Sequence, residues 1–191
     1  MNDRIGSFAR RYALELSIVG LACIVLIVGV IMTQANHTPA APSAAVAPPG
    51  ADSAAGGGGK ALPGKTAYSL DVVRSGSQSI SAAGKEHVQV SIGRGNSMLL
   101  AGWAIDLPGG KPAGGISAQV DGGKDLPGSY GAERADVASA LKNDAFGHSA
   151  FVIVVPASEL PPGSHTISLK ILNAARSGYY FVSDPLDVSV N

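Results

Sequence analysis

Two patterns of hydrophobic positions divide the chain. Near the N-terminus, residues 16–32 contain no charged side chain. A helix over 12–33 would be roughly 30 Å long at about 1.5 Å per residue, which matches the hydrocarbon core of a bilayer. Glu15 would then lie at its edge, within reach of the lipid headgroups. The pattern predicts one transmembrane signal-anchor helix at 12–33, which makes the inner membrane the first expected partner.

The charges around this run predict its orientation. Arg4, Arg10 and Arg11 precede it, and the next cationic residue is Lys60. Because cytoplasmic flanks are enriched in Lys and Arg, we expect residues 1–11 in the cytoplasm. The C-terminal part is then periplasmic, or more generally extracytoplasmic, and the chain is a single-pass protein of the cell inner membrane.

The apolar run admits two other interpretations. A cleaved signal peptide would use the small residues at 33–35, but its apolar region is usually only about 7–15 residues long. A lipoprotein acylated at Cys23 would turn polar after the cysteine, whereas here the apolar run continues. The sequence leaves open whether the helix is retained or cleaved, and whether the sequon at Asn36 is used.

A segment rich in Ala, Pro and Gly follows at 34–66. Such a composition buries too little apolar surface to offset its chain entropy. We expect a disordered tether that holds the next domain away from the bilayer.

From residue 67 onward the hydrophobic period is two, which is typical of strands with one buried face. The predicted strands are 68–72, 88–92, 99–105, 116–120, 151–155, 166–171, 179–182 and 186–190. Seven or eight short strands separated by turn residues indicate a mainly β domain at 67–191, an antiparallel β-sandwich. Residues 136–142 instead predict one short crossover helix, with Asp136 as its N-cap and Lys142 at its C-terminal end.

Composition and charge bear on which partners and which chemistry are expected. Lys and Arg together number 14, as do Asp and Glu, so nothing favours a nucleic-acid partner. The single cysteine, Cys23, lies in the apolar run, which leaves the outer domain without a disulfide or thiolate.

Candidate chemistry is sparse. His37, His87, His148 and His165 do not have metal-ligand spacing. No Gly-x-Ser-x-Gly turn is present, and most carboxylates fall in turns. We therefore predict no catalytic residue, no metal and no cofactor.

Arg134 and Asp136 admit two interpretations. They could clamp a carboxylate or a sugar acid from outside the chain. The alternative, which we favour, is that Asp136 caps the helix while Arg134 pairs with a nearby acid or carbonyl and pins the crossover.

The aromatic residues supply the candidate binding surface. Trp103 shares the face of its strand with Leu99, Ala101 and Ile105 and is expected to be buried in the sandwich. Tyr179, Tyr180 and Phe181 are consecutive, so either Tyr180 or the pair on its two sides must face outward. Together with Tyr130, they are candidates for stacking on a sugar or a partner chain.

Several short motifs support a family resemblance over residues 98–181. These are Gly-Trp-Ala-Ile-Asp at 102–106, Val-Asp-Gly-Gly at 120–123, Tyr-Gly at 130–131 followed by Arg134 and Asp-Val-Ala at 136–138, and Leu-Pro-Pro-Gly-Ser-His-Thr-Ile at 160–167. They are similar to an Ig-like β-sandwich module of bacterial envelope proteins, sometimes appended to membrane glycosyltransferase-like proteins. Ala135 departs from the pattern, where proline is expected.

The resemblance implies a non-catalytic role and transfers no catalytic residue. We expect a binding or scaffolding module that contacts an envelope protein, or alternatively a carbohydrate-binding module for an envelope glycan.

Overall fold

The computed structural model describes residues 59–85, 88–182 and 186–191. The predicted cytoplasmic segment 1–11, the helix at 12–33 and the linker up to residue 58 lie outside these residues. Within them, no helix is long and apolar enough to cross a bilayer.

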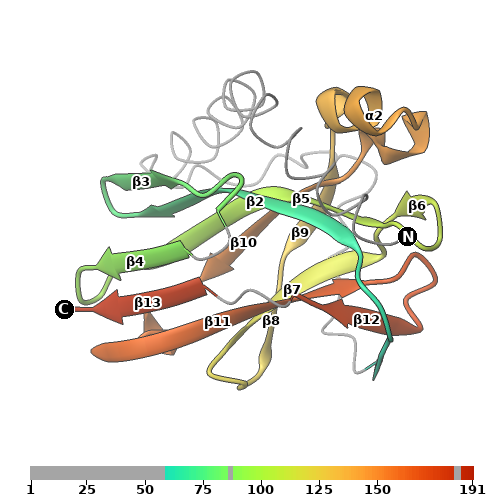
Figure 1. Cartoon of the computed structure of the whole chain (residues 1–191). Helices are drawn as coiled ribbons and strands as arrows, with labels where there is room; N and C mark the ends of the chain where they lie inside the picture. The colour runs from blue at the N-terminus through green and yellow to red at the C-terminus, as the bar shows by residue number, and fades with distance from the viewer. Residues whose placement is uncertain (1–58, 86–87, 183–185) are drawn as a thin grey trace, which may run out of the picture.

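The described chain is mainly β and forms two sheets with one short α-helix (Figure 1). The seven-stranded sheet contains β1 (Lys60–Ala61), β4 (Val88–Ile92), β7 (Gly115–Val120), β8 (Asp125–Pro127), β11 (Gly163–Leu172), β12 (Gly178–Phe181) and β13 (Leu186–Val190). The six-stranded sheet contains β2 (Ala67–Ser75), β3 (Gln78–Ser81), β5 (Met98–Asp106), β6 (Lys111–Pro112), β9 (Ser129–Ala132) and β10 (Ala150–Val155).

All eight predicted strands are present, and the mainly β fold is confirmed. The additional strands β1, β3, β6, β8 and β9 have two to four residues each, too short for a period of two to be recognised. Among the described residues, β-structure is present from Lys60, because β1 pairs with β12.

Two pairings correct the expectation of a purely antiparallel sandwich. β13 pairs in parallel with β4, and β12 pairs in parallel with β1. All other ladders are antiparallel. In both exceptions an early segment of the domain lies beside a late one, a long-range pairing that local periodicity does not reveal.

The predicted helix is α2 (Ala135–Leu141), followed by the 3₁₀ turn η2 (Asp144–Gly147), while a second turn, η3 (Ala157–Glu159), follows β10. α2 connects β9 to β10, which are antiparallel neighbours in one sheet. It is therefore an insertion between neighbouring strands and not the crossover that was predicted.

β5 is buried on both faces, which creates two hydrophobic clusters. Its residues Leu100 and Ala104 belong to the main core between the sheets. Trp103 and Ile105 instead pack with Val137 of α2 and Phe146 of η2. Trp103 is thus buried as predicted, at 4% exposure, but under the helix and outside the core between the sheets.

Gly102 permits this arrangement. A Cβ atom at this position would lie 2.0 Å from the carbonyl oxygen of Ser69 on β2. The β2–β5 register shifts between Leu70 and Val72, so that Asp71 is the extra residue of an irregularity that has the form of a β-bulge. Only glycine fits where β2 approaches β5 so closely.

Candidate functional site

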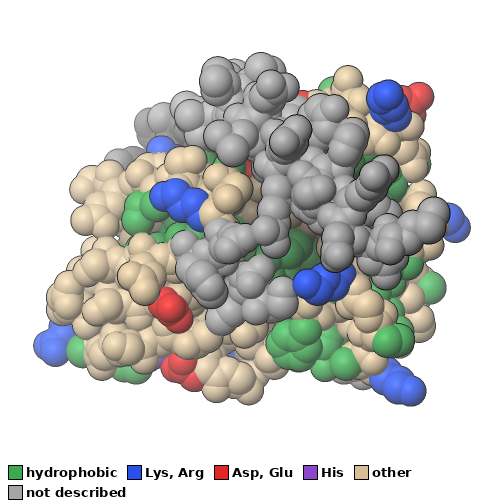
Figure 2. Space-filling model, in the orientation of Figure 1, with side chains coloured by type: hydrophobic (Ala, Val, Ile, Leu, Met, Phe, Trp, Pro, Cys, Tyr) green, Lys and Arg blue, Asp and Glu red, His purple; other side chains and the backbone are tan. Residues whose placement is uncertain are grey.

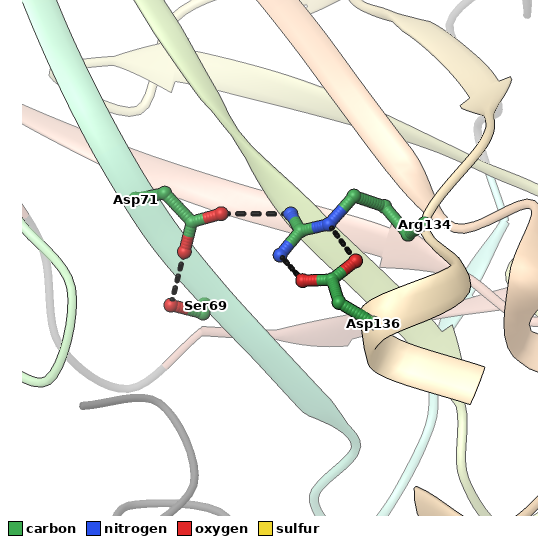
Figure 3. A network of polar contacts seen from close by, with 4 residues as sticks. All are labelled: Ser69, Asp71, Arg134 and Asp136. Carbon is green, nitrogen blue, oxygen red and sulfur yellow. Dashed lines mark hydrogen bonds and ion pairs between the residues drawn. The ribbon is translucent and has the colours of Figure 1, made fainter. Parts of the chain in front are cut away.

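Arg134 lies at the centre of a buried polar network (Figure 3). Its Nε and Nη2 donate to the two carboxylate oxygens of Asp136, each at 2.8 Å. Its Nη1 donates to Asp71 Oδ2 at 2.7 Å, and Ser69 donates to the other oxygen of Asp71 at 2.7 Å. With 5% of its side chain exposed, Arg134 holds α2 against β2. The guanidinium edge that would clamp an outside carboxylate is thus occupied from within the chain.

Asp136 is not the helix N-cap, which corrects the prediction. The capping position is Arg134, which makes no side-chain capping bond. Burial alone would raise the pKa of Asp136, but the hydrogen bonds and charge of Arg134 outweigh it and lower the pKa below its ordinary value of 3.8. The carboxylate is therefore held ionised as a partner of Arg134.

Tyr130 is half-buried on β9, which belongs to the other sheet from Tyr179, Tyr180 and Phe181 on β12. Its hydroxyl donates to the carbonyl of Ala104 at 2.6 Å and accepts from the N–H of Ala113 at 2.8 Å. Burial raises the pKa of Tyr130 to about 12. The side chain thus fastens β9 to the end of β5 and to the segment after β6.

Tyr180 faces inward and is 6% exposed. Its hydroxyl donates to Oδ1 of Asp106, itself buried, at 3.0 Å. Asp106 also accepts from the N–H of Gly109 at 3.1 Å and of Ala174 at 2.9 Å. Burial and the Asp106 carboxylate raise the pKa of Tyr180. This buried carboxylate at the end of β5 thus connects two loops, at Gly109 and Ala174, and strand β12 of the other sheet.

Tyr179 and Phe181 face outward, the second of the two arrangements that the sequence leaves open. Their ring centroids are 5.4 Å apart with an interplanar angle of 71°. Lys170 Nζ lies 4.8 Å from the Tyr179 centroid and 5.8 Å from the Phe181 centroid. The same ammonium lies 2.9 Å from Asp125 Oδ1. We refer to Lys170, Tyr179 and Phe181 as the aromatic patch.

Of the four predicted surface residues, the structure therefore brings only Tyr179 and Phe181 together. Phe181 is 49% exposed and, with Val154, is one of the two large hydrophobic side chains exposed among the described residues. Lys170 was missed because its partners lie on neighbouring strands; Phe181 stands directly opposite it in the β11–β12 ladder. The alternation of β11 shows that Lys170 faces outward, but not that it lies over aromatic rings.

Two of the predicted histidines, His148 and His165, lie among the described residues. His148 is exposed, whereas His165 near the start of β11 contacts Asp121 through Nδ1 at 2.8 Å and the carbonyl of Pro161 through Nε2 at 2.7 Å. These acceptors raise the pKa of His165, and the histidine lowers the pKa of Asp121. Within the described ranges, no group of three or more His, Cys, Asp or Glu side chains could hold a metal ion.

Charge is dispersed on the described surface. On the face that Figure 2 shows, Lys and Arg side chains are spread among neutral atoms, and the fewer Asp and Glu side chains include one beside a cationic side chain at the upper right. This agrees with the balance of 14 cationic and 14 anionic residues in the whole chain.

Comparison with known proteins adds little. No protein-family model matches the chain, and no curated protein matches it. Among solved structures, the chain is similar to the crystal structure of domains 4 and 5 of the S-layer protein SbsC, at 19% identity and a TM-score of 0.30. The match covers 64% of this chain and 47% of the S-layer chain. A TM-score of this size does not establish a shared fold.

Proposed function

We propose that this protein is a membrane-tethered, non-enzymatic binding or scaffolding module of the bacterial cell envelope, and that its Ig-like domain contacts an envelope protein. The layout supports this proposal, with an apolar run at 12–33 that predicts a helix, a segment rich in Ala, Pro and Gly, and a mainly β domain. Residues 12–33 hold it in the inner membrane, with the domain on the periplasmic side.

The observation that carries the proposal is that the reactive polar side chains have partners within the chain, while two aromatic side chains face outward. Arg134, Asp136, Tyr130 and Asp106 have the chemistry to bind or catalyse, yet each is engaged by partners within the chain. The rings of Tyr179 and Phe181 are instead turned outward, whereas Lys170 of the same patch is 11% exposed and paired with Asp125. Aromatic side chains are enriched at protein interfaces and contribute much of their binding energy.

The geometry of the patch favours a protein over a flat sugar ring. Because Tyr179 and Phe181 are inclined at 71°, they cannot both lie parallel to one pyranose face. They form instead an edge-to-face pair, which suits an apolar side chain of a protein partner.

A cross-linked pull-down from native membranes tests the proposal, using the full chain with a C-terminal tag. We expect a defined envelope protein to be recovered with the wild type and with Val154→Ser, but not with Phe181→Ser. Val154 is the matched control, since it is equally exposed, at 54%, but lies on the other sheet. Equal recovery with both variants, or recovery of no defined protein, would contradict the proposal.

The second candidate, a carbohydrate-binding module, rests on the same patch. One ring, that of Tyr179, could stack on a sugar while Lys170 and Asp125 bind its hydroxyls. Titration of the full chain with envelope glycan fragments, followed by tyrosine fluorescence, discriminates the two. A saturable response that is lost in Tyr179→Ala favours the glycan, and a flat titration favours the protein partner.

A further inference from the structure

β4 is an edge strand of the seven-stranded sheet. It pairs in parallel with β13, and it has no second partner strand among the described residues (Figure 1). Its five residues, Val88 to Ile92, alternate regularly between buried and exposed.

The hydrogen bonds at its end show which main-chain groups face outward. Asn191 donates its N–H to Ile92 at 3.0 Å, and Arg94 donates its N–H to Asn191 at 2.9 Å. Main-chain groups alternate in direction along a strand. The N–H and C=O groups of residues 88, 90 and 92 therefore face β13, while those of Gln89 and Ser91 point to the free edge.

This edge lacks the features that protect β1, β8 and β9. Native proteins block edge strands with charges, proline, bulges or very short length. β8 has three residues including Asp125 and Pro127, and β1 has two residues including Lys60. β9 contains Gly131 at φ +101° and borders a register shift. β4 has no charge, no proline and no register shift.

β3 is another uncharged edge without proline or register shift, but it differs in one respect. Only Ile80 of its four residues is apolar, and the other three are exposed. A strand added beside β3 would extend no hydrophobic row. β4 instead presents three buried apolar side chains, those of Val88, Val90 and Ile92.

The pattern of β4 is symmetric about Val90. In an antiparallel pair of two copies centred there, Val88 would face Ile92 of the second copy, and Gln89 would face Ser91. Apolar residues then meet apolar residues on the inner face, polar residues meet polar residues on the outer face, and no charges oppose each other. The outward N–H and C=O groups of Gln89 and Ser91 lie at the hydrogen-bonded positions of this register.

We infer that β4 is a homodimerisation edge, at which two copies of this chain join their seven-stranded sheets by antiparallel β4–β4 pairing about Val90. The occupant is a second copy because the symmetric pattern meets the isologous condition of a twofold interface. Tethering in a membrane would raise the local concentration of copies. The inference goes beyond the proposed function and does not depend on an envelope partner.

Disulfide cross-linking in native membranes tests the inference and its register. All chains are full length and carry Cys23→Ser. Chains with Gln89→Cys and chains with Ser91→Cys, differently tagged, are co-expressed. Directly opposed residues at hydrogen-bonded positions have Cα atoms about 5.5 Å apart, which suits a disulfide.

We expect the mixed pair to cross-link several-fold more than either variant alone, since identical positions are offset by two residues in this register. The control is Ser189→Cys, which is exposed on the same face but belongs to β13, one strand farther from the edge. The inference would be overturned if the cross-linked yield of the Gln89→Cys and Ser91→Cys pair were no higher than that of the Ser189→Cys control, or were below the yield of either single variant.

A second variant tests the inference without cysteine substitutions, which could themselves disturb folding. Gln89→Pro removes an N–H that faces the free edge, so the β4–β13 ladder is preserved. We expect this variant to melt like the wild type and to lose the dimer in light scattering of the detergent-solubilised full chain. A wild type that is monomeric throughout, or a dimer that persists in Gln89→Pro, would contradict pairing through β4.

Discussion

The hydroxyl of Tyr180 donates a hydrogen bond of 3.0 Å to the carboxylate of Asp106, two residues 74 positions apart in the sequence. This bond joins β12 of one sheet to the end of β5 in the other. It also explains the orientation of the aromatic patch, because fixing Tyr180 inward turns Tyr179 and Phe181 outward on the same short strand.

Loss of the hydrogen bonds to Asp106 is expected to destabilise the domain. Asp106→Ala leaves three donors without their acceptor, two of them main-chain N–H groups, and should lower the free energy of unfolding by about 3 kcal/mol. Tyr180→Phe removes only one donor and should lower it by about 1 kcal/mol. Chemical denaturation followed through the fluorescence of Trp103, the single tryptophan, measures both. Equal losses would show that Tyr180 is the only important partner of Asp106.

Arg134 is expected to be among the least replaceable polar residues. Arg134→Ala would leave Asp71 and Asp136 facing each other without a cation, at a cost of about 3–5 kcal/mol in unfolding free energy. Arg134→Lys should recover only part of this loss, because an ammonium cannot make the two parallel bonds to Asp136. Full recovery by lysine would mean that charge alone stabilises the network.

The free energy of unfolding at acid pH depends on the same network of Arg134, Asp71 and Asp136. Because the pKa of Asp136 is lowered in the folded state, its contribution is present above its unfolded value of about 3.8 and is lost as pH falls through the folded pKa. Asp136→Asn should flatten this part of the profile. Denaturation curves between about pH 2 and pH 5 check it.

The raised pKa of His165 predicts the opposite dependence of stability on pH. Its pKa is raised above 6.5, so the stabilisation it contributes is complete below that value and is lost as pH rises through the folded pKa. Both of its contacts are acceptors, which the doubly protonated ring satisfies. His165→Gln should remove this loss between pH 6 and pH 9. A wild-type profile that is flat in this range would contradict the proton assignment.

The second hydrophobic cluster is expected to hold α2 in place. Phe146→Ala, at a position 4% exposed, should cost about 3–5 kcal/mol in unfolding free energy. It should also shift the Trp103 emission to longer wavelength as water reaches the ring. An unchanged emission maximum would place Trp103 elsewhere than beneath this helix.

The sequence predicted what depends on local alternation and missed what depends on distant pairing. The eight main strands, the helix near 136–142 and the burial of Trp103 follow from hydrophobic periods of two and 3.6. Arg134 was identified, but its partner Asp71 lies 63 residues away in a bulge of β2. No local pattern connects the two.

Trp103 shows how a correct pattern can support a wrong placement. The alternation of β5 groups Trp103 with Ile105, and both are buried. Which face of the sheet they occupy depends on α2, which is inserted later in the chain. Likewise, the three consecutive aromatic residues 179–181 predict that either Tyr180 or its two neighbours face outward. The acceptor that fixes Tyr180 inward, Asp106, is on the other sheet and cannot be identified from this local pattern.

The most direct test of the proposed function is site-specific photo-cross-linking in living cells. A photoreactive phenylalanine derivative replaces Phe181 in one full-length chain and Val154 in another. The account predicts one discrete cross-linked envelope protein from position 181, and none from position 154. Cross-links from both positions to the same species, or from neither, would contradict a binding surface centred on Tyr179 and Phe181.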